Sequence, residues 1–231
     1  MQEQLPRSGS FAGEPDMELP VKSRKAAGQA LAEALQDYKE RDDVIVLALP
    51  RGGVPVAVEV AEALDAELDL MLVRKLGTPG QRELAMGAIA SGGSRVMNED
   101  VVRSLNISED AIRQVEEAER KELQRREQAY RGDRPWPELA NRCVILVDDG
   151  LATGATMRAA VDAVRQDDPA HLVVAVPVAP PDTVDMLRRK VDEMVCLAEP
   201  EPFMAIGMWY ADFSQVSDDE VRHILGKAWR E

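Results

Sequence analysis

The chain has 231 residues, of which 45% are hydrophobic, 30% are charged and only 4% are aromatic. This composition excludes a disordered chain, and the length allows a core that needs no disulfide or metal. The formal net charge of −14 argues against a surface that binds duplex nucleic acid or an anionic membrane through its overall charge. An anionic ligand would therefore need local cations or a bound metal.

Cysteine and histidine are scarce. Cys143 and Cys196 each lie in an apolar run typical of a buried strand, so we expect free thiols in a reducing compartment. Two histidines cannot complete a zinc site of the usual spacing. The first residues lack the apolar segment of a signal peptide, and no run reaches the ~18 apolar residues of a membrane span. We expect a cytoplasmic protein without a membrane partner.

The chain divides into a tail and one domain. Residues 1–20 are rich in Gly, Pro, Ser and Glu and show no periodicity, which predicts a disordered N-terminal tail. No internal repeat and no second core follow, so we expect a single domain over residues 21–231.

Strands and helices alternate within this domain. Apolar runs and apolar residues at helical spacing predict, in chain order, helix 24–38, strand 44–49, helix 54–64, strand 68–73, helix 108–131, strand 143–147, helix 157–165, strand 171–178, helix 181–190, strand 192–197 and helix 217–229. This alternation is typical of an α/β fold, a mostly parallel twisted sheet flanked by helices.

The segment 74–98 interrupts the alternation. It carries six Gly and Pro residues among short apolar pieces, so we expect a long flexible loop with at most one hairpin, formed by residues 84–90 and 95–97. Long glycine-rich segments that leave a rigid sheet are often functional lids.

Unusual residues follow three of the predicted strands, namely Arg51-Gly52-Gly53, Arg74-Lys75 and Asp148-Asp149. Ligands of open parallel sheets bind beyond the carboxyl ends of the strands, so we expect one site there. The adjacent carboxylates could accept hydrogen bonds from a vicinal sugar diol or help to hold a hydrated metal.

The acid pair leads into a small-residue turn at a predicted helix start. Unpaired amides, the helix dipole and two hydroxyls predict a cradle for one phosphate group, formed by Ala152, Thr153, Gly154, Ala155 and Thr156. The turn is not a P-loop, because no Lys precedes the final Thr. The plainer alternative is an ordinary turn with a helix cap.

A hydrophobic strand, two acids and a Thr-Gly turn from Val144 to Thr156 resemble the signature of the type I phosphoribosyltransferases, which use phosphoribosyl pyrophosphate. The resemblance covers about residues 44–213. The chain is also similar to bacterial members of unassigned base acceptor, with the shared features Pro50-Arg51-Gly52-Gly53, Val73-Arg74-Lys75 and Asp212-Phe213. This resemblance implies a Rossmann-like sheet, a small C-terminal hood, a long flexible loop and a homodimer.

The resemblance also implies roles for individual residues. Asp148 and Asp149 contact the ribose hydroxyls, and Ala152 to Thr156 hold the 5′-phosphate. Pyrophosphate binds at a loop that often contains a non-proline cis peptide, here Arg51, Gly52 and Gly53, with Arg74 and Lys75 as further cations. Mg²⁺ is the implied cofactor, with Asp148, Asp149 and the hood residue Asp212 as its ligands.

The implied reaction displaces pyrophosphate from ribose C1 by a nitrogenous base, with a purine-like base favoured and no covalent protein intermediate. Lys75 is implied as a catalytic cation. Hypoxanthine and guanine enzymes carry a carboxylate where Ala152 stands, so the motif looks most like the adenine branch, whose acid comes from the mobile loop. This makes Glu83 a candidate acid, although a solvated loop carboxylate is the alternative.

Aromatic side chains gather in the predicted hood. Phe203 and Trp209 could stack on a flat base or simply pack in the core, and the sequence leaves both interpretations open. Two other functions also stay open. The fold could sense phosphoribosyl pyrophosphate or a nucleotide without catalysis, or it could hydrolyse or phosphorolyse a ribosyl phosphate.

Overall fold

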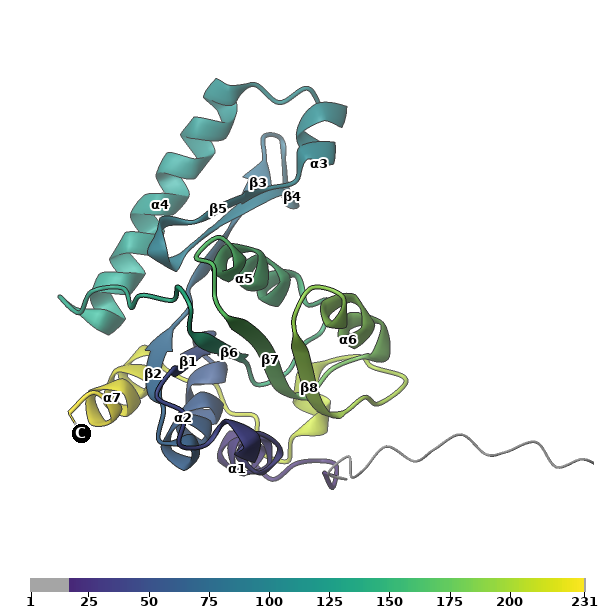
Figure 1. Cartoon of the computed structure of the whole chain (residues 1–231). Helices are drawn as coiled ribbons and strands as arrows, with labels where there is room; N and C mark the ends of the chain where they lie inside the picture. Colours follow the sequence, from purple (N-terminus) through teal and green to yellow (C-terminus); the bar gives the residue numbers. More distant parts are fainter. Residues whose placement is uncertain (1–16, 231) are drawn as a thin grey trace, which may run out of the picture.

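The computed structural model describes residues 17–230 (Figure 1). Most of the tail predicted over residues 1–20 lies outside the described residues. Met17 already packs against the core, and Val21 forms a parallel bridge with Tyr210. Over residues 17–230, no helix combines the length and the apolar character that a membrane span requires.

The main sheet has five parallel strands in the order β2-β1-β6-β7-β8. They are β1 (Val44–Ala48), β2 (Glu67–Leu70), β6 (Cys143–Val147), β7 (His171–Val178) and β8 (Glu193–Ala198). Every residue of β1 and β6 is buried, as expected for central strands covered on both faces. The predicted α/β fold class is confirmed, and Cys143 and Cys196 are free thiols as predicted.

Helices form a layer on each face of this sheet. One core cluster joins it to α1 (Arg24–Ala34), α2 (Gly53–Leu64) and α7 (Asp218–Ala228). A second cluster joins the other face to α5 (Ala155–Arg165) and α6 (Pro181–Arg188). The predicted helix over 24–38 ends at Ala34 and is followed by a 3-10 turn over Gln36–Tyr38.

A second, antiparallel sheet occupies the segment for which a loop was predicted. It pairs β3 (Val73–Thr78), β4 (Gln81–Ala90) and β5 (Arg95–Met97), and leads to α3 (Glu99–Ser104) and α4 (Glu109–Arg131). The predicted hairpin of residues 84–90 and 95–97 is present as β4 and β5, but the limit to one hairpin was wrong because β3 adds a third strand. Leu76, Met86 and Ile89 supply an apolar face of this sheet that joins the core. α5 lies between the two sheets (Figure 1).

The strand predicted over 68–73 is split between the two sheets. β2 ends at Leu70, and β3 begins at Val73 in the antiparallel sheet. Arg74 and Lys75 therefore lie inside β3, and the prediction that they follow the carboxyl end of a main-sheet strand was wrong.

The C-terminal segment between β8 and α7 returns across the end of the main sheet. Its 3-10 turn, Ile206–Trp209, precedes Tyr210, and the backbone of Val21 bonds to both Trp209 and Ala211 at 2.8 Å. This segment corresponds to the expected hood, and α1 begins directly beneath it.

Candidate active site

The strand order reverses between β1 and β6. The chain leaves β1 toward β2 on one side, whereas β6 leads to β7 and β8 on the other. Open α/β sheets bind ligands at such a switch point, beyond the carboxyl ends of the strands. The segments that emerge there are residues 50–53 after β1 and residues 148–156 after β6.

These two segments are in close contact. The Pro50–Arg51 peptide bond is cis, as the resemblance implies for this loop. A Cβ on Gly52 would lie 2.0 Å from Oδ2 of Asp149, and a Cβ on Gly53 would lie 2.7 Å from the carbonyl oxygen of Val147. Only glycine therefore allows this loop to lie against the acid pair.

Asp149 faces a cation of the chain itself. Nε of Arg24 donates to its Oδ2 at 2.7 Å, and the two side chains are only 11% and 10% exposed. Burial raises the pKa of the Asp149 carboxyl, and the Arg24 guanidinium opposes that shift. The carboxylate expected to contact a ribose hydroxyl is thus already held by a protein group.

Arg24 joins the acid pair to the hood. Its Nη1 donates to the carbonyl oxygen of Ser214 at 2.7 Å, and its guanidinium carbon lies 4.0 Å from the centre of the Phe213 ring. The Tyr210 hydroxyl donates to the backbone carbonyl of Asp149 at 2.6 Å. Sequence reasoning missed both contacts. The aromatic cluster of the hood was a signal for Tyr210, whereas the sequence offered none for Arg24.

Asp148 is the more open member of the pair. Its side chain is half-buried, and its Oδ1 accepts the backbone amide of Asp149 at 2.8 Å. Burial and the negative charge of Asp149 raise the pKa of the Asp148 carboxyl well above its usual value. A cation or hydroxyl donors placed here would relieve that repulsion.

The turn after the acid pair presents open donors. Ala152, Thr153, Ala155 and Thr156 are exposed at the start of α5, and the amide of Ala155 donates only to Oγ1 of Thr153, at 3.4 Å. Within residues 17–230, the backbone amides of Thr153, Gly154 and Thr156 donate to no protein acceptor. The positive end of the helix dipole adds to this donor set, which suits an anion.

The predicted cations lie in two places. Arg51 stays at the switch point, with Nη1 at 3.7 Å from Oδ1 of Asp218 at the start of α7. Arg74 is paired with Glu119 of α4 at 2.6 Å. Nζ of Lys75 lies 3.4 Å from Oε2 of the fully exposed Glu83.

Arg74, Lys75 and Glu83 line a cleft of about 640 Å³ between the β3–β4 hairpin and α4, away from the acid pair. Lys75 also borders a second cleft of about 600 Å³, which Ala155 and Thr156 share. Lys75 is therefore the predicted cation that the structure brings next to the exposed turn.

The hood residues named from the sequence have their partners within the hood and the neighbouring core. Phe203 and Trp209 have ring centroids 6.0 Å apart and pack against the cluster around Val21. Asp212 is exposed and accepts the amide of Ser214 at 3.1 Å. No group of three or more His, Cys, Asp or Glu in residues 17–230 is placed to hold a metal, so Asp212 does not complete a site with the acid pair.

Comparison with known proteins assigns the family. The model of the phosphoribosyl transferase domain matches residues 21–208, most of the chain. The chain belongs to this family. Two proteins of Mycobacterium tuberculosis, one from strain CDC 1551 and one from strain H37Rv, are provisionally named phosphoribosyl transferases and are each 47% identical to it over 208 residues.

The alignment to these family members covers 90% of the present chain and 47% of theirs, so the chain spans about half the length of the curated relatives it matches. A crystal structure of the protein TT1426 from Thermus thermophilus is 43% identical, with a TM-score of 0.81. That match covers 90% of the present chain and 98% of TT1426.

Proposed function

We propose that the chain transfers ribose 5-phosphate from phosphoribosyl pyrophosphate to a nitrogenous base, purine-like in preference, and releases pyrophosphate. One observation carries the proposal. At the switch point of the sheet, the half-buried Asp148 is followed within a few residues by a turn, residues 153–156, whose backbone amides are open to a ligand. A ribose carrying a 5′-phosphate needs both a diol acceptor and an amide-lined anion site.

Each part of the donor molecule has a candidate partner. The ribose hydroxyls donate to Asp148, and the 5′-phosphate accepts hydrogen bonds from the turn at Thr153 and Thr156. The pyrophosphate lies beside the loop of Arg51 and is approached by Lys75. A bond forms between the base nitrogen and C1, the bond from C1 to the pyrophosphate oxygen breaks, and its electron pair leaves with pyrophosphate. The base nitrogen gives up its proton to water.

The site fits Mg²⁺ held mainly by the substrate. Mg²⁺ usually keeps several waters and is bound through one or two carboxylates together with substrate phosphates, and Asp148 offers one such carboxylate. When bound, the ion neutralises the charge of the leaving pyrophosphate. Arg24 keeps Asp149 in place beside this carboxylate.

A non-catalytic sensor of the same ligand is the second candidate. The ion pair of Arg24 with Asp149 and the pair of Arg74 with Glu119 both favour it, because they occupy groups that a transferase would direct to its substrate. A sensor would bind phosphoribosyl pyrophosphate or a nucleotide and show no turnover.

The test is pyrophosphate release from Mg-phosphoribosyl pyrophosphate with a panel of purine and pyrimidine bases. The transferase proposal expects release with one acceptor, and a loss of about 10²-fold in Asp148→Asn. Asp133→Asn, at an exposed loop position, is the matched control and should keep full activity. Binding without release for every base would support the sensor, and release without any base would indicate hydrolysis.

A further inference from the structure

A separate cleft of about 590 Å³ lies against the C-terminal half of α4. This volume is typical of small-molecule sites. Its lining includes the three arginines Arg120, Arg131 and Arg134, the glycine turn Gly92-Gly93, Trp136 and one carboxylate, that of Glu127. None of the residues that line it belongs to the acid pair or to the turn after it.

A buried arginine in this lining has a free donor. Arg131 is only 8% exposed, and its Nη2 donates to the carbonyl oxygen of Leu70 at 2.9 Å and pairs with Asp69 at 2.8 Å. Within the described part of the chain, its Nε has no hydrogen-bond partner. A buried guanidinium N–H without an acceptor is costly, and the Trp136 ring, whose centroid lies 5.0 Å from the guanidinium carbon, separates this side chain from solvent.

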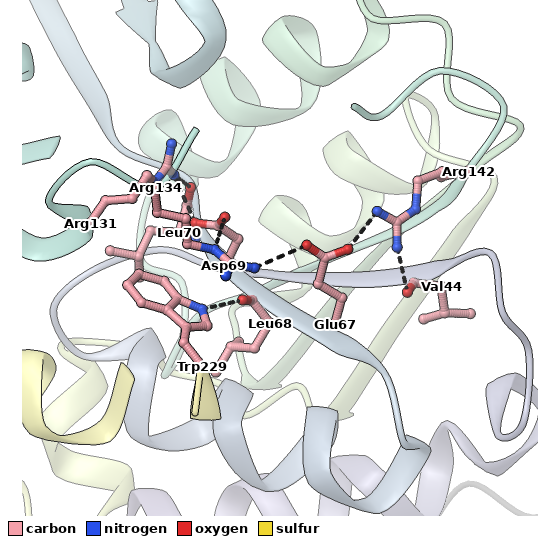
Figure 2. A network of polar contacts seen from close by, with 9 residues as sticks. All are labelled: Val44, Glu67, Leu68, Asp69, Leu70, Arg131, Arg134, Arg142 and Trp229. Atoms are coloured by element: carbon pink, nitrogen blue, oxygen red, sulfur yellow. Dashed lines mark hydrogen bonds and ion pairs between the residues drawn. The ribbon is translucent and has the colours of Figure 1, made fainter. Parts of the chain in front are cut away.

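The charges around this arginine do not balance. Figure 2 shows the polar network along β2, in which Arg131, Arg134 and Arg142 meet only two carboxylates, those of Glu67 and Asp69. The network therefore carries one surplus positive charge. Arg131 and Arg134 both border the cleft, whereas Arg142 lies outside it and shares Glu67 with Arg134.

The turn between β4 and β5 supplies backbone donors to the same cleft. Gly92 and Gly93 both have positive φ, at 80° and 85°. A Cβ on Gly92 would lie 2.7 Å from Nε1 of Trp136, so the turn can lie against the indole only with glycine there. Successive amides in turns of this kind form concave sites for anions.

We propose that this cleft binds the phosphate group of a small phosphorylated molecule. Arginine binds phosphate in bidentate fashion, and the partly exposed guanidinium groups of Arg120 and Arg134 border the cleft together with the Gly92-Gly93 turn. The volume leaves room for a mononucleotide as well as for free phosphate. The proposal does not depend on the transferase reaction.

The experiment is a two-dimensional NMR titration of the three tryptophan indole groups with inorganic phosphate in one arm and AMP in the other. Trp136 lines the cleft, and the Trp229 ring centroid lies 4.9 Å from the guanidinium carbon of the cleft residue Arg134, so Trp209 in the hood is the signal remote from the cleft. Equal affinity for phosphate and AMP would show that the cleft recognises the phosphate group alone. Tighter binding of AMP would identify a nucleotide as the ligand.

Two variants remove a cation from the cleft, and a third is their control. Arg120→Gln and Arg134→Gln each remove a partly exposed lining arginine and should weaken the saturable shift of Trp136 by about tenfold. Arg142→Gln removes an arginine from the same network at a position outside the cleft and should leave the affinity unchanged.

Several results would overturn the proposal. They are a Trp136 signal that does not shift at millimolar ligand, a shift that survives both cleft variants, and an equal loss in Arg142→Gln. Asp148→Asn separates this site from the proposed active site. A Trp136 shift that this variant abolishes would assign the binding to the acid pair, whereas loss of turnover with an intact shift leaves the cleft proposal standing.

Discussion

The acid pair after β6 and the arginine network along β2 are opposite solutions to the burial of charge. Asp148 and Asp149 have one close cation, Arg24, so negative charge is in excess. Along β2, three arginines meet the carboxylates of Glu67 and Asp69, so positive charge is in excess. The excess of negative charge in the first region suits a cation with hydroxyl donors, and in the second region Arg131 and Arg134 border the cleft for which we propose a phosphate group.

Removal of the central arginine should have the largest effect on stability. Arg131→Met leaves Asp69 buried without its closest cation, and we expect the free energy of unfolding to fall by about 3–5 kcal/mol. Urea denaturation measures this change. Arg125→Met on the same helix removes an exposed ion pair with Glu122 and should cost less than about 1 kcal/mol. Equal losses in the two variants would mean that the network contributes no more than a surface pair.

A single added methyl group should disturb the contact between Gly52 and the acid pair. In Gly52→Ala the new Cβ would collide with Asp149, so we expect a loss of about 1–3 kcal/mol in unfolding free energy and weaker binding of phosphoribosyl pyrophosphate. The control Gly226→Ala, in α7, meets only the end of the flexible Arg230 side chain and should instead add up to about 1 kcal/mol. Unchanged stability and binding in Gly52→Ala would show that the loop does not need its contact with the acid pair.

The smallest expected effect is the contribution of Asp69 to the pH dependence of stability. Burial raises the pKa of Asp69 although Arg131 opposes the shift, so the folded state holds this proton to a higher pH than the unfolded state does. Stability from this group is complete below the unfolded pKa of about 3.9 and is lost as the pH rises through the raised folded pKa, by about 1.4 kcal/mol per pKa unit. Urea denaturation of both chains across this range should therefore show a steeper fall in the unfolding free energy of the wild-type chain than in that of Asp69→Asn, and parallel curves would contradict it.

The main sheet could be predicted from the sequence because its signals are local. The apolar runs 44–48 and 143–147 are long enough to fix two central strands, and the acids and small residues that follow them in the sequence also meet in space. Of the second sheet, only the hairpin of β4 and β5 was predicted, because the glycines of the segment conceal the apolar face formed by Leu76, Met86 and Ile89.

The ion pairs that occupy Asp149 and Arg74 could not be predicted from the sequence in the same way. Arg24 and Asp149 are 125 residues apart, and nothing in the sequence around Arg24 distinguishes it from a surface cation at the start of a helix. Arg74 was assigned to the main-sheet edge because β2 and β3 read as one apolar strand, and its pairing with Glu119 depends on how α4 packs over the second sheet.

The most direct test of the central claim is calorimetric binding of phosphoribosyl pyrophosphate in the presence of Mg²⁺, with the wild-type chain and Asp148→Asn compared at the same ionic strength. The claim that the acid pair and the turn after it hold the ribose 5-phosphate predicts saturable binding by the wild-type chain, and about tenfold or weaker affinity in the variant. Equal affinity in both proteins, or no binding by either at millimolar ligand, would contradict it.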